Sequence, residues 1–171
     1  PFCTIEPNTG IVAVPDNRLK LLSELAKSQK VIPAQMQFVD IAGLVSGASK
    51  GEGLGNKFLS HIREVDALVH VLRCFEDADI THVENSIDPL RDAEIIETEL
   101  MLADLESLDR QIQNLSKKAK SNDSDAKNDL LLMKEISTFL SDGKPIRLAD
   151  LTQDKAKRIK TFNLLTSKPV L

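Results

Sequence analysis

A strand that ends in a carboxylate and continues into a glycine-rich loop is the feature that most limits how this chain can fold. Residues 38–55 read FVDIAGLVSGASKGEGLG, with an apolar run that ends at Asp40. Five of the seven glycines of the chain fall in this one segment: Gly43, Gly47, Gly51, Gly53 and Gly55. Open α/β sheets bind their ligands beyond the carboxyl ends of the strands. The segment therefore predicts an α/β fold with a ligand site beside Asp40.

Asp40 and Gly43 have the spacing of the Asp-x-x-Gly element of P-loop GTPases. In that element the aspartate holds Mg²⁺, usually through a water molecule, and the glycine N–H contacts the γ-phosphate. Glycine suits this role because a backbone amide approaches a phosphate closely only where no Cβ intervenes. A loop so rich in glycine is also typical of a switch that orders when nucleotide binds. A flexible loop without a site fits the same spacing, and a four-residue match does not separate the two interpretations.

A dinucleotide-binding turn at Gly51-x-Gly53-x-Gly55 is disfavoured. The glycine turn of that motif follows its strand directly, because its backbone must approach the pyrophosphate at the strand end. Here about ten residues separate Asp40 from the first of these glycines, and the third glycine is out of place.

The residues around the loop alternate between strand and helix patterns. Strands are predicted at 9–14, 36–41 and 67–75, and helices at 17–28 and 56–65. The two helical segments carry apolar residues at helical spacing: Leu19, Leu22 and Leu25, and then Phe58, Leu59, Ile62 and Val65. The continuous apolar run at 67–75 has the composition of a buried strand in a mostly parallel sheet.

From residue 88 onward the pattern is helical. Asp88 is expected to cap a helix that has Pro89 at its first position. Apolar residues then repeat at alternating spacings of three and four, the heptad pattern of a coiled coil: Met101, Leu105, Leu108, Ile112 and Leu115, and later Ala126, Leu130, Met133, Ile136 and Leu140. Asp142-Gly143 is expected to end the second helix. We therefore expect an antiparallel helical hairpin inserted between two strands of the α/β domain.

Composition excludes several classes of function. A net charge of −4 leaves no overall basic surface for DNA or for an anionic membrane. No apolar stretch approaches the ~20 residues of a membrane span. Cys3 and Cys74 lie far apart and are expected to be reduced thiols of a cytoplasmic protein.

A local basic cluster at Lys117, Lys118 and Lys120 allows two interpretations. Positive charge near the carboxyl end of a helix interacts favourably with the helix dipole. Contact with ribosomal RNA is the alternative, and the sequence leaves both open.

Longer motifs make a family resemblance specific. The segments PFCTIEPNTG (1–10), FVDIAGLVSGASKGEGLGNKFLSHIRE (38–64) and RCFED (73–77) closely resemble the YchF branch of the Obg-like P-loop NTPases. The resemblance extends over essentially the whole chain, through IDPLRD, the two helical segments and NLLTSKPVL. It implies a ribosome-associated regulatory NTPase that hydrolyses ATP or GTP, tends to favour ATP, and associates with the large ribosomal subunit.

The resemblance also assigns roles to three residues. Thr4 matches the switch threonine, whose hydroxyl binds Mg²⁺ and whose N–H meets the γ-phosphate. Asp40 matches the aspartate that holds the metal, and Gly43 matches the γ-phosphate glycine. The implied fold class is α/β, a partial P-loop NTPase sheet with an inserted antiparallel α-helical coiled-coil hairpin.

The implied organisation has three parts. Residues 1–87 would form part of the nucleotide-binding domain, residues 88–150 the helical insertion, and residues 151–171 a return to that domain through a helix near 152–162 and the start of a strand.

Two departures limit what the chain can do by itself. Leu44 occupies the position where Ras-like enzymes place a glutamine that orients water, so slow hydrolysis is expected, with backbone or a K⁺ ion positioning the water. The phosphate-binding loop is expected before Pro1, and the base-reading segment after Leu171. We therefore expect activity in an intact parent protein and none in this chain. A non-catalytic interaction module, whose helical hairpin binds a protein or a ribosomal partner, is the alternative.

Overall fold

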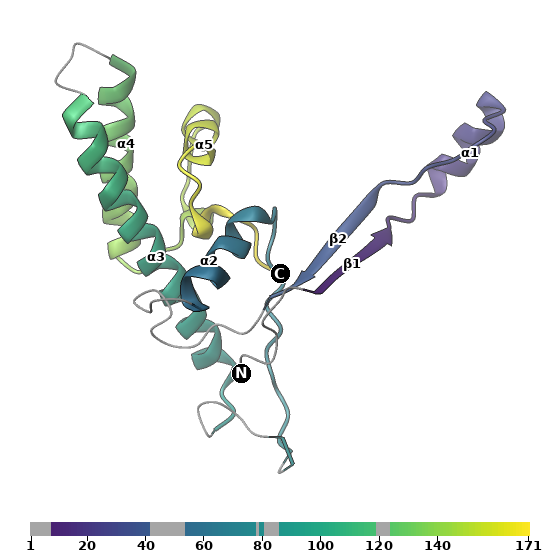
Figure 1. Ribbon diagram of the computed structural model, residues 1–171, viewed down its shortest axis with the longest axis horizontal. Helices are drawn as coiled ribbons and strands as arrows, with labels where there is room; N and C mark the ends of the chain where they lie inside the picture. The colour runs from purple at the N-terminus through teal and green to yellow at the C-terminus, as the bar shows by residue number, and fades with distance from the viewer. Residues whose placement is uncertain (1–7, 42–53, 78, 81–85, 119–123) are drawn as a thin grey trace. The chain divides into compact units, whose positions relative to one another are not determined.

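The computed structural model describes residues 8–41, 54–77, 79–80, 86–118 and 124–171. For residues 54–57 and 118 it describes the backbone alone. The chain forms two compact units, Phe2–Gly43 and Leu44–Leu171. We call them the N-terminal unit and the C-terminal unit and describe each by itself (Figure 1).

The N-terminal unit is a strand–helix–strand arrangement. Strand β1 (Asn8–Ala13) and strand β2 (Gln35–Asp40) flank helix α1 (Asn17–Ala26). All three elements were predicted, with ends within two residues of those observed. The two strands pair antiparallel, with Asn8 opposite Asp40 and Ala13 opposite Gln35. The predicted mostly parallel sheet is therefore wrong for this pair, since apolar composition carries no information about strand direction.

The apolar side chains of the N-terminal unit are largely exposed. Ile11, Leu25 and Phe38 keep 65%, 84% and 49% of their surface accessible, and α1 has no buried residue. Local contacts hold α1 instead: the Asp16 carboxylate accepts a hydrogen bond from the Arg18 backbone N–H at 2.9 Å, as an N-cap does. The predicted apolar face of this helix therefore faces no core within the described residues.

The C-terminal unit begins with helix α2 (Leu54–Glu64). Leu59 and Ile62 are buried and Phe58 is half-buried, so the predicted amphipathic helix is confirmed. The predicted buried strand 67–75 is mostly wrong. Only Leu68 forms a bridge, in parallel with Val170, and Val71 is 87% exposed. Within the described residues this segment has a backbone partner on one side only, which is too little to make a buried central strand.

Two long helices make up most of the C-terminal unit. Helix α3 (Pro89–Lys118) and helix α4 (Ser124–Ser141) lie side by side (Figure 1). The Asp88 carboxylate accepts a hydrogen bond from the Arg91 backbone N–H at 3.1 Å, which confirms the predicted N-cap. At the end of α4, Gly143 has a φ of 75°. Its N–H donates to the carbonyl of Leu140, and the Lys144 N–H donates to that of Phe139, the two bonds of a Schellman motif.

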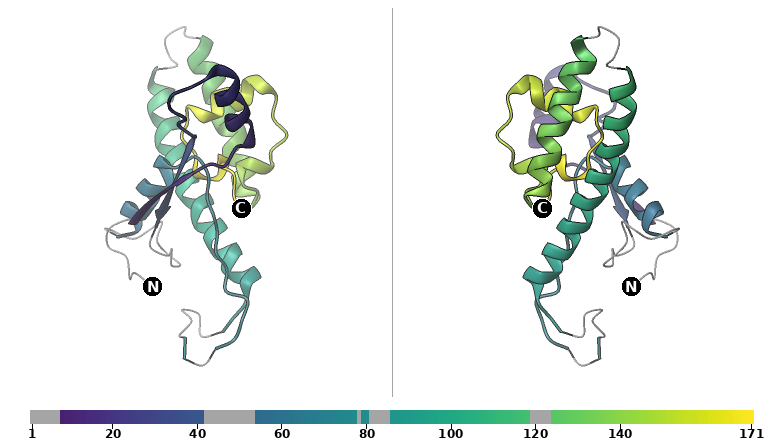
Figure 2. Two further views of the ribbon diagram at one scale, coloured as in Figure 1. Left: turned by 90° about the vertical axis from the view of Figure 1, so that its right-hand side faces the viewer. Right: turned by 90° about the vertical axis from the view of Figure 1, so that its left-hand side faces the viewer.

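Three short elements follow α4. They are the 3₁₀ turn η1 (Ile146–Leu148), helix α5 (Gln153–Lys160) and the 3₁₀ turn η2 (Leu165–Ser167). Ion pairs between Lys155 and Glu135 and between Arg158 and Asp129 join α5 to α4. The two views of Figure 2 show α5 beside the α3–α4 pair.

The core lies between the two long helices and this third layer. Its buried members come from the α3 and α4 seams and from the 146–164 segment: Met101, Leu108, Leu132, Met133, Ile136, Leu140, Ile146, Ile159, Phe162 and Leu164. The heptad positions thus point inward as predicted, but they also pack against η1 and α5 rather than only against each other. Knobs-into-holes coiled-coil packing stays a prediction, as do the domain boundaries at 87/88 and 150/151.

Candidate functional site

Asp40 is the predicted site residue that the structure describes. It is the last residue of β2, it is exposed, and it lies opposite Asn8, the first residue of β1. Antiparallel pairing places the start of β1 and the end of β2 at the same end of the two-stranded sheet. The chain that carries Thr4 therefore enters the sheet where the chain that carries Gly43 leaves it. Thr4, Gly43 and Leu44 themselves lie outside the described residues.

The chemistry at this end of the sheet fits a magnesium ion. Mg²⁺ prefers oxygen ligands and keeps several of its waters, so it needs only one or two protein groups. Asp40 supplies an exposed carboxylate, and the threonine hydroxyl of Thr4 would be a second hard oxygen ligand. Within the described ranges, no group of three or more His, Cys, Asp or Glu residues could hold a metal ion. A metal here would therefore depend on waters and nucleotide oxygens for the rest of its coordination.

The helix that follows the glycine-rich loop is held at its far end by a lysine. The Lys168 ammonium donates to the backbone carbonyl of Arg63 at 2.7 Å and to that of Val65. These carbonyls lie at the carboxyl end of α2, where helix geometry leaves the last acceptors without partners. Positive charge at this end also suits the helix dipole. Lys168 therefore acts as a side-chain cap of α2.

A buried aspartate fixes the segment that carries this lysine. Asp104 of α3 is fully buried, and its carboxylate accepts hydrogen bonds from the backbone N–H groups of Leu165 and Thr166 at 2.7 and 2.8 Å. The Thr166 hydroxyl donates to the same carboxylate at 2.7 Å and accepts from the Ile146 N–H at 3.4 Å. A buried polar group is tolerated when its hydrogen-bonding capacity is used in this way. Asp104 thus ties α3 to both η2 and η1.

Burial shifts the pKa values of Asp104 and Lys168 in opposite directions. Burial raises the pKa of Asp104, and its hydrogen bonds with Thr166 and Leu165 and the nearby charge of Arg63 only partly offset this effect. Burial likewise lowers the pKa of Lys168, partly offset by the carboxylates of Asp66 and Asp104. In both groups desolvation disfavours the charged form.

The sequence analysis did not identify Asp104, Thr166 or Lys168. A signal for the first was present, because Asp104 lies three residues after Met101 and four before Leu108, on the side of α3 that turns inward. A carboxylate at a buried position is expected to accept hydrogen bonds from nearby donors. The identity of those donors could not be found, because Thr166 is 62 residues away along the chain.

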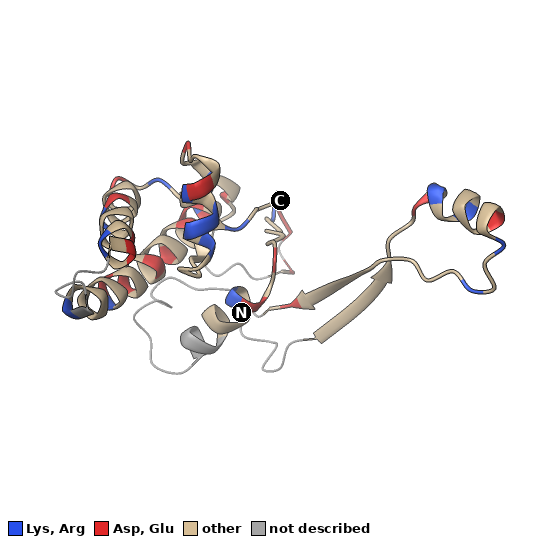
Figure 3. Cartoon of the chain, turned by 90° about the horizontal axis from the view of Figure 1, so that it is seen from above, with Lys and Arg blue, Asp and Glu red and all other residues tan. Residues whose placement is uncertain are grey.

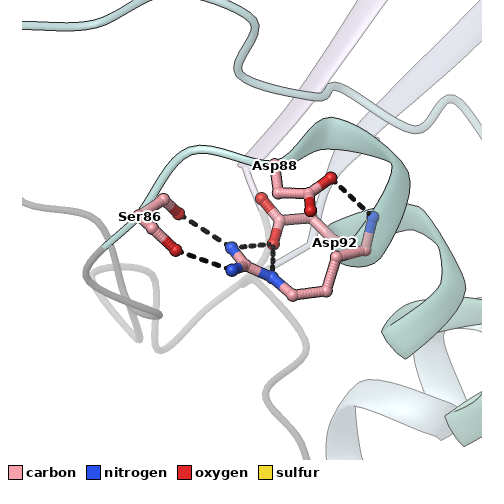
Figure 4. A network of polar contacts seen from close by, with 4 residues as sticks. Ser86, Asp88 and Asp92 are labelled. Atoms are coloured by element: carbon pink, nitrogen blue, oxygen red, sulfur yellow. Dashed lines mark hydrogen bonds and ion pairs between the residues drawn. The ribbon is translucent and has the colours of Figure 1, made fainter.

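The amino end of α3 has a polar network of its own (Figure 4). The Arg91 guanidinium donates to the hydroxyl and the carbonyl of Ser86, each at 2.7 Å, and to the Asp92 carboxylate at 3.0 and 3.2 Å. Together with the Asp88 cap, these bonds hold the chain that leads into the helix. They use local partners, so we assign them a structural role.

Arg73, from the RCFED motif, organises an exposed turn. Its guanidinium donates to the carbonyls of Phe75, Asp77 and Ile80 at 3.0, 3.1 and 2.9 Å, and it lies 5.0 Å from the centre of the Phe75 ring. Cys74 beside it is a free, exposed thiol. These contacts explain why an arginine suits this motif without pointing to a ligand.

Charges of both signs are interspersed along α3, α4 and α5 (Figure 3). Lys117 is exposed near the end of α3, whereas the Lys118 side chain and Lys120 lie outside the described residues. The two interpretations of this lysine cluster therefore both remain open. None of the helices in the described part of the chain combines the length and apolar character needed to cross a membrane.

Comparison with known families places Asp40 and the glycine-rich segment inside one family match. Residues 1–134 match the family model described as 50S ribosome-binding GTPase. This match covers most of the 171 residues, so the chain belongs to the 50S ribosome-binding GTPase family.

Individual relatives show which proteins the chain is similar to. The chain is 56% identical over all 171 residues to the ribosome-binding ATPase YchF of Pasteurella multocida and 51% identical to that of Bacillus subtilis. It is 48% identical over 172 aligned positions to Obg-like ATPase 1 of Oryza sativa subsp. indica. The chain spans 47% of the length of the two bacterial relatives and 44% of the rice one.

A solved structure supports the same fold. The chain superposes on the Schizosaccharomyces pombe YchF GTPase with a TM-score of 0.76 and 40% identity, over 100% of this chain and 47% of the other. The α/β GTPase-like fold class is therefore confirmed, and the resemblance to YchF-type, Obg-like NTPases is confirmed with it.

Proposed function

We propose that this chain is the part of a slow, Mg²⁺-dependent, ATP- or GTP-hydrolysing regulatory protein that carries its switch segments and helical insertion. The observation that carries the proposal is the placement of Asp40, at the end of β2 and opposite the first residue of β1. The match of residues 1–134 to a GTPase family supports it. Relatives that share about half of their length with the chain are named ribosome-binding ATPases, and a similar structure is named a GTPase. The choice between ATP and GTP is left open.

Three residues would act on the nucleotide. The Asp40 carboxylate would hold Mg²⁺, and a metal bound there would lower the charge repulsion on the phosphates. The Thr4 hydroxyl would be the second protein ligand, and its N–H would bind the γ-phosphate. The Gly43 N–H would bind the same phosphate. These roles need the two strand ends that β1 and β2 bring together.

Leu44 sets the expected rate. A leucine neither donates nor accepts a hydrogen bond, so it cannot orient the attacking water as a glutamine does. Backbone groups or a K⁺ ion would take that part, and hydrolysis would be slow. Residues 1–171 alone are expected to turn over no nucleotide, because a lysine and backbone amides that cradle the phosphates supply much of the transition-state stabilisation in this class.

The ribosome is the proposed macromolecular partner of the full-length protein, through its large subunit. The family description and the names of the relatives both refer to ribosome binding. A protein with this partner acts in the cytoplasm, where ribosomes are found.

The experiment is substitution Asp40→Asn in the full-length protein, with steady-state hydrolysis measured as a function of Mg²⁺. The change removes the charge at nearly constant volume, so we expect at least tenfold slower turnover, which corresponds to ~1.4 kcal/mol of barrier, and a need for more Mg²⁺. Asp109→Asn, an exposed aspartate on α3, is the matched control and should leave both unchanged. Unchanged turnover and Mg²⁺ dependence in Asp40→Asn would remove this residue from the metal site.

A second candidate is an interaction module built on α3 and α4. The observation in its favour is that the core of this region draws all its buried members from residues 101–164. Such a region can present its outer face to a protein or ribosomal partner without any nucleotide chemistry. Ribosome binding that persists after deletion of residues 98–140 would exclude this role.

A further inference from the structure

The carboxyl end of α2 is attached to the helical insertion by two groups of hydrogen bonds, which the backbone of residues 166–168 joins. Asp104 of α3 holds Thr166, and Lys168, two residues later, holds the Arg63 and Val65 carbonyls at the end of α2. All these contacts lie within the C-terminal unit. The Asp104–Thr166 bonds join residues 62 positions apart in the chain, and the Lys168 bonds join residues 103 and 105 positions apart.

The segment that carries Lys168 is held on both sides. Before it, Leu165 and Thr166 are bonded to the buried Asp104. After it, the Pro169 carbonyl accepts from the Leu68 N–H at 2.9 Å, and the Leu171 N–H donates to the Leu68 carbonyl at 3.0 Å. A lysine usually has much side-chain freedom to lose. Here the backbone around Lys168 is already fixed, so binding the α2 carbonyls costs only the rotamer freedom of the side chain.

The helix that Lys168 caps is the one that follows the glycine-rich loop. A helix of 11 residues behaves as a short rigid rod, so a constraint at its carboxyl end also restrains its amino end. Leu54, the first residue of α2, lies eleven positions after Gly43. The described contacts that hold the α2 carboxyl end therefore restrain the direction of the whole helix.

We propose that Lys168 is a positioning residue that sets the orientation of α2, and that the Asp104–Thr166 pair holds Lys168 in place, so that α2 is mechanically linked to the helical insertion. A partner that displaces α3 would shift Lys168 and, with it, the carboxyl end of α2. The expected effect of Lys168 on hydrolysis rests on the proposed function. The effect of Lys168 on the orientation of α2 does not rest on it.

The first experiment measures hydrogen exchange of backbone amides in the full-length protein without nucleotide. In Lys168→Met, which keeps the apolar stem and removes the ammonium, we expect the last turn of α2 to exchange about three- to tenfold faster. Amides of α4 should be unchanged, which separates a local effect from loss of global stability. Lys168→Arg retains donors for the two carbonyls and should restore most of the protection.

Two further variants sharpen this measurement. Lys160→Met, an exposed lysine on α5, is the matched control and should leave α2 unchanged. Thr166→Val removes the hydroxyl bond to Asp104 and should also accelerate exchange in the last turn of α2, with an effect that is not additive with Lys168→Met. Unchanged α2 exchange in Lys168→Met, or equal acceleration in α2 and α4, would overturn the proposal.

The second experiment measures single-turnover hydrolysis in the same variants. We expect Lys168→Met to slow the chemical step severalfold while nucleotide affinity changes less, because α2 follows the predicted phosphate-binding Gly43 in the sequence and carries no predicted phosphate ligand itself. Slower hydrolysis in Lys160→Met to the same degree would contradict a specific positioning role. If the wild-type protein hydrolyses neither nucleotide, the proposed function fails, and hydrogen exchange still decides whether Lys168 positions α2.

Discussion

The two units of the chain use apolar residues in opposite ways. In the N-terminal unit, Leu25 is 84% exposed and α1 buries nothing, although its leucines have helical spacing. In the C-terminal unit, Leu108 and Leu140 have the same kind of spacing and are 0% and 2% exposed. The difference shows that an apolar helix face is buried only where other elements of the fold cover it. Stability arises where a second and a third layer cover that face, as α4, η1 and α5 do for α3.

The largest expected difference between the units comes from removing a buried leucine. Leu108→Ala should lower the free energy of unfolding by about 3–5 kcal/mol, because it creates a cavity in addition to losing buried apolar surface. Leu25→Ala, the matched change in the N-terminal unit, should alter it by less than about 0.5 kcal/mol. Urea unfolding followed by circular dichroism measures both. Similar losses for the two variants would show that α1 is buried in solution.

A smaller effect is expected from the buried carboxylate. Asp104→Asn should cost about 2–3 kcal/mol, because the amide NH₂ must face one of the two backbone N–H donors of Leu165 and Thr166. The same urea titration measures this loss. Asp109→Asn on the exposed side of α3 is the control and should have no measurable effect.

The same site can be tested by measuring the free energy of unfolding of wild type and Asp104→Asn as a function of pH. The sign of the expected change follows from the raised pKa of Asp104. A carboxyl whose pKa is higher in the folded state stabilises the fold fully below its unfolded pKa of about 3.9. That contribution is lost as the pH rises through the folded pKa. The stability difference between wild type and Asp104→Asn should therefore be greatest in acid and shrink as the pH rises. A difference that grows with pH would mean that the hydrogen bonds outweigh burial.

The smallest effect concerns how the helices of the two units end. Gly143 ends α4 with a φ of 75°, and Lys27 ends α1 with a φ of 49°. Gly143→Ala should cost about 1 kcal/mol, because a side chain is strained in the left-handed region. Lys27→Gly should leave the cooperative unfolding transition unchanged, since α1 contributes little to it. Circular dichroism melts of both variants give the comparison.

Local features of this protein were accessible from the sequence. The Asp88 cap, the Gly143 stop and the inward-facing Met101, Leu108 and Met133 depend on residues within a few positions of one another, and all were predicted correctly. The apolar run before Asp40 predicted that a strand ends near this residue, which the structure confirms. The family could be recognised for the same reason, because its motifs are contiguous.

Tertiary structure alone decided strand direction, burial and long-range polar contacts. Whether β1 and β2 pair parallel or antiparallel depends on a partner strand. The apolar run at 67–75 is partly exposed because too few of the described residues cover it. The bonds from Asp104 to Thr166 and from Lys168 to Arg63 join residues 62 and 105 positions apart. Hydrophobic periodicity predicts which face of an element turns inward, but it does not predict which distant donor will form a hydrogen bond with a buried acceptor. That choice is made only when the chain packs.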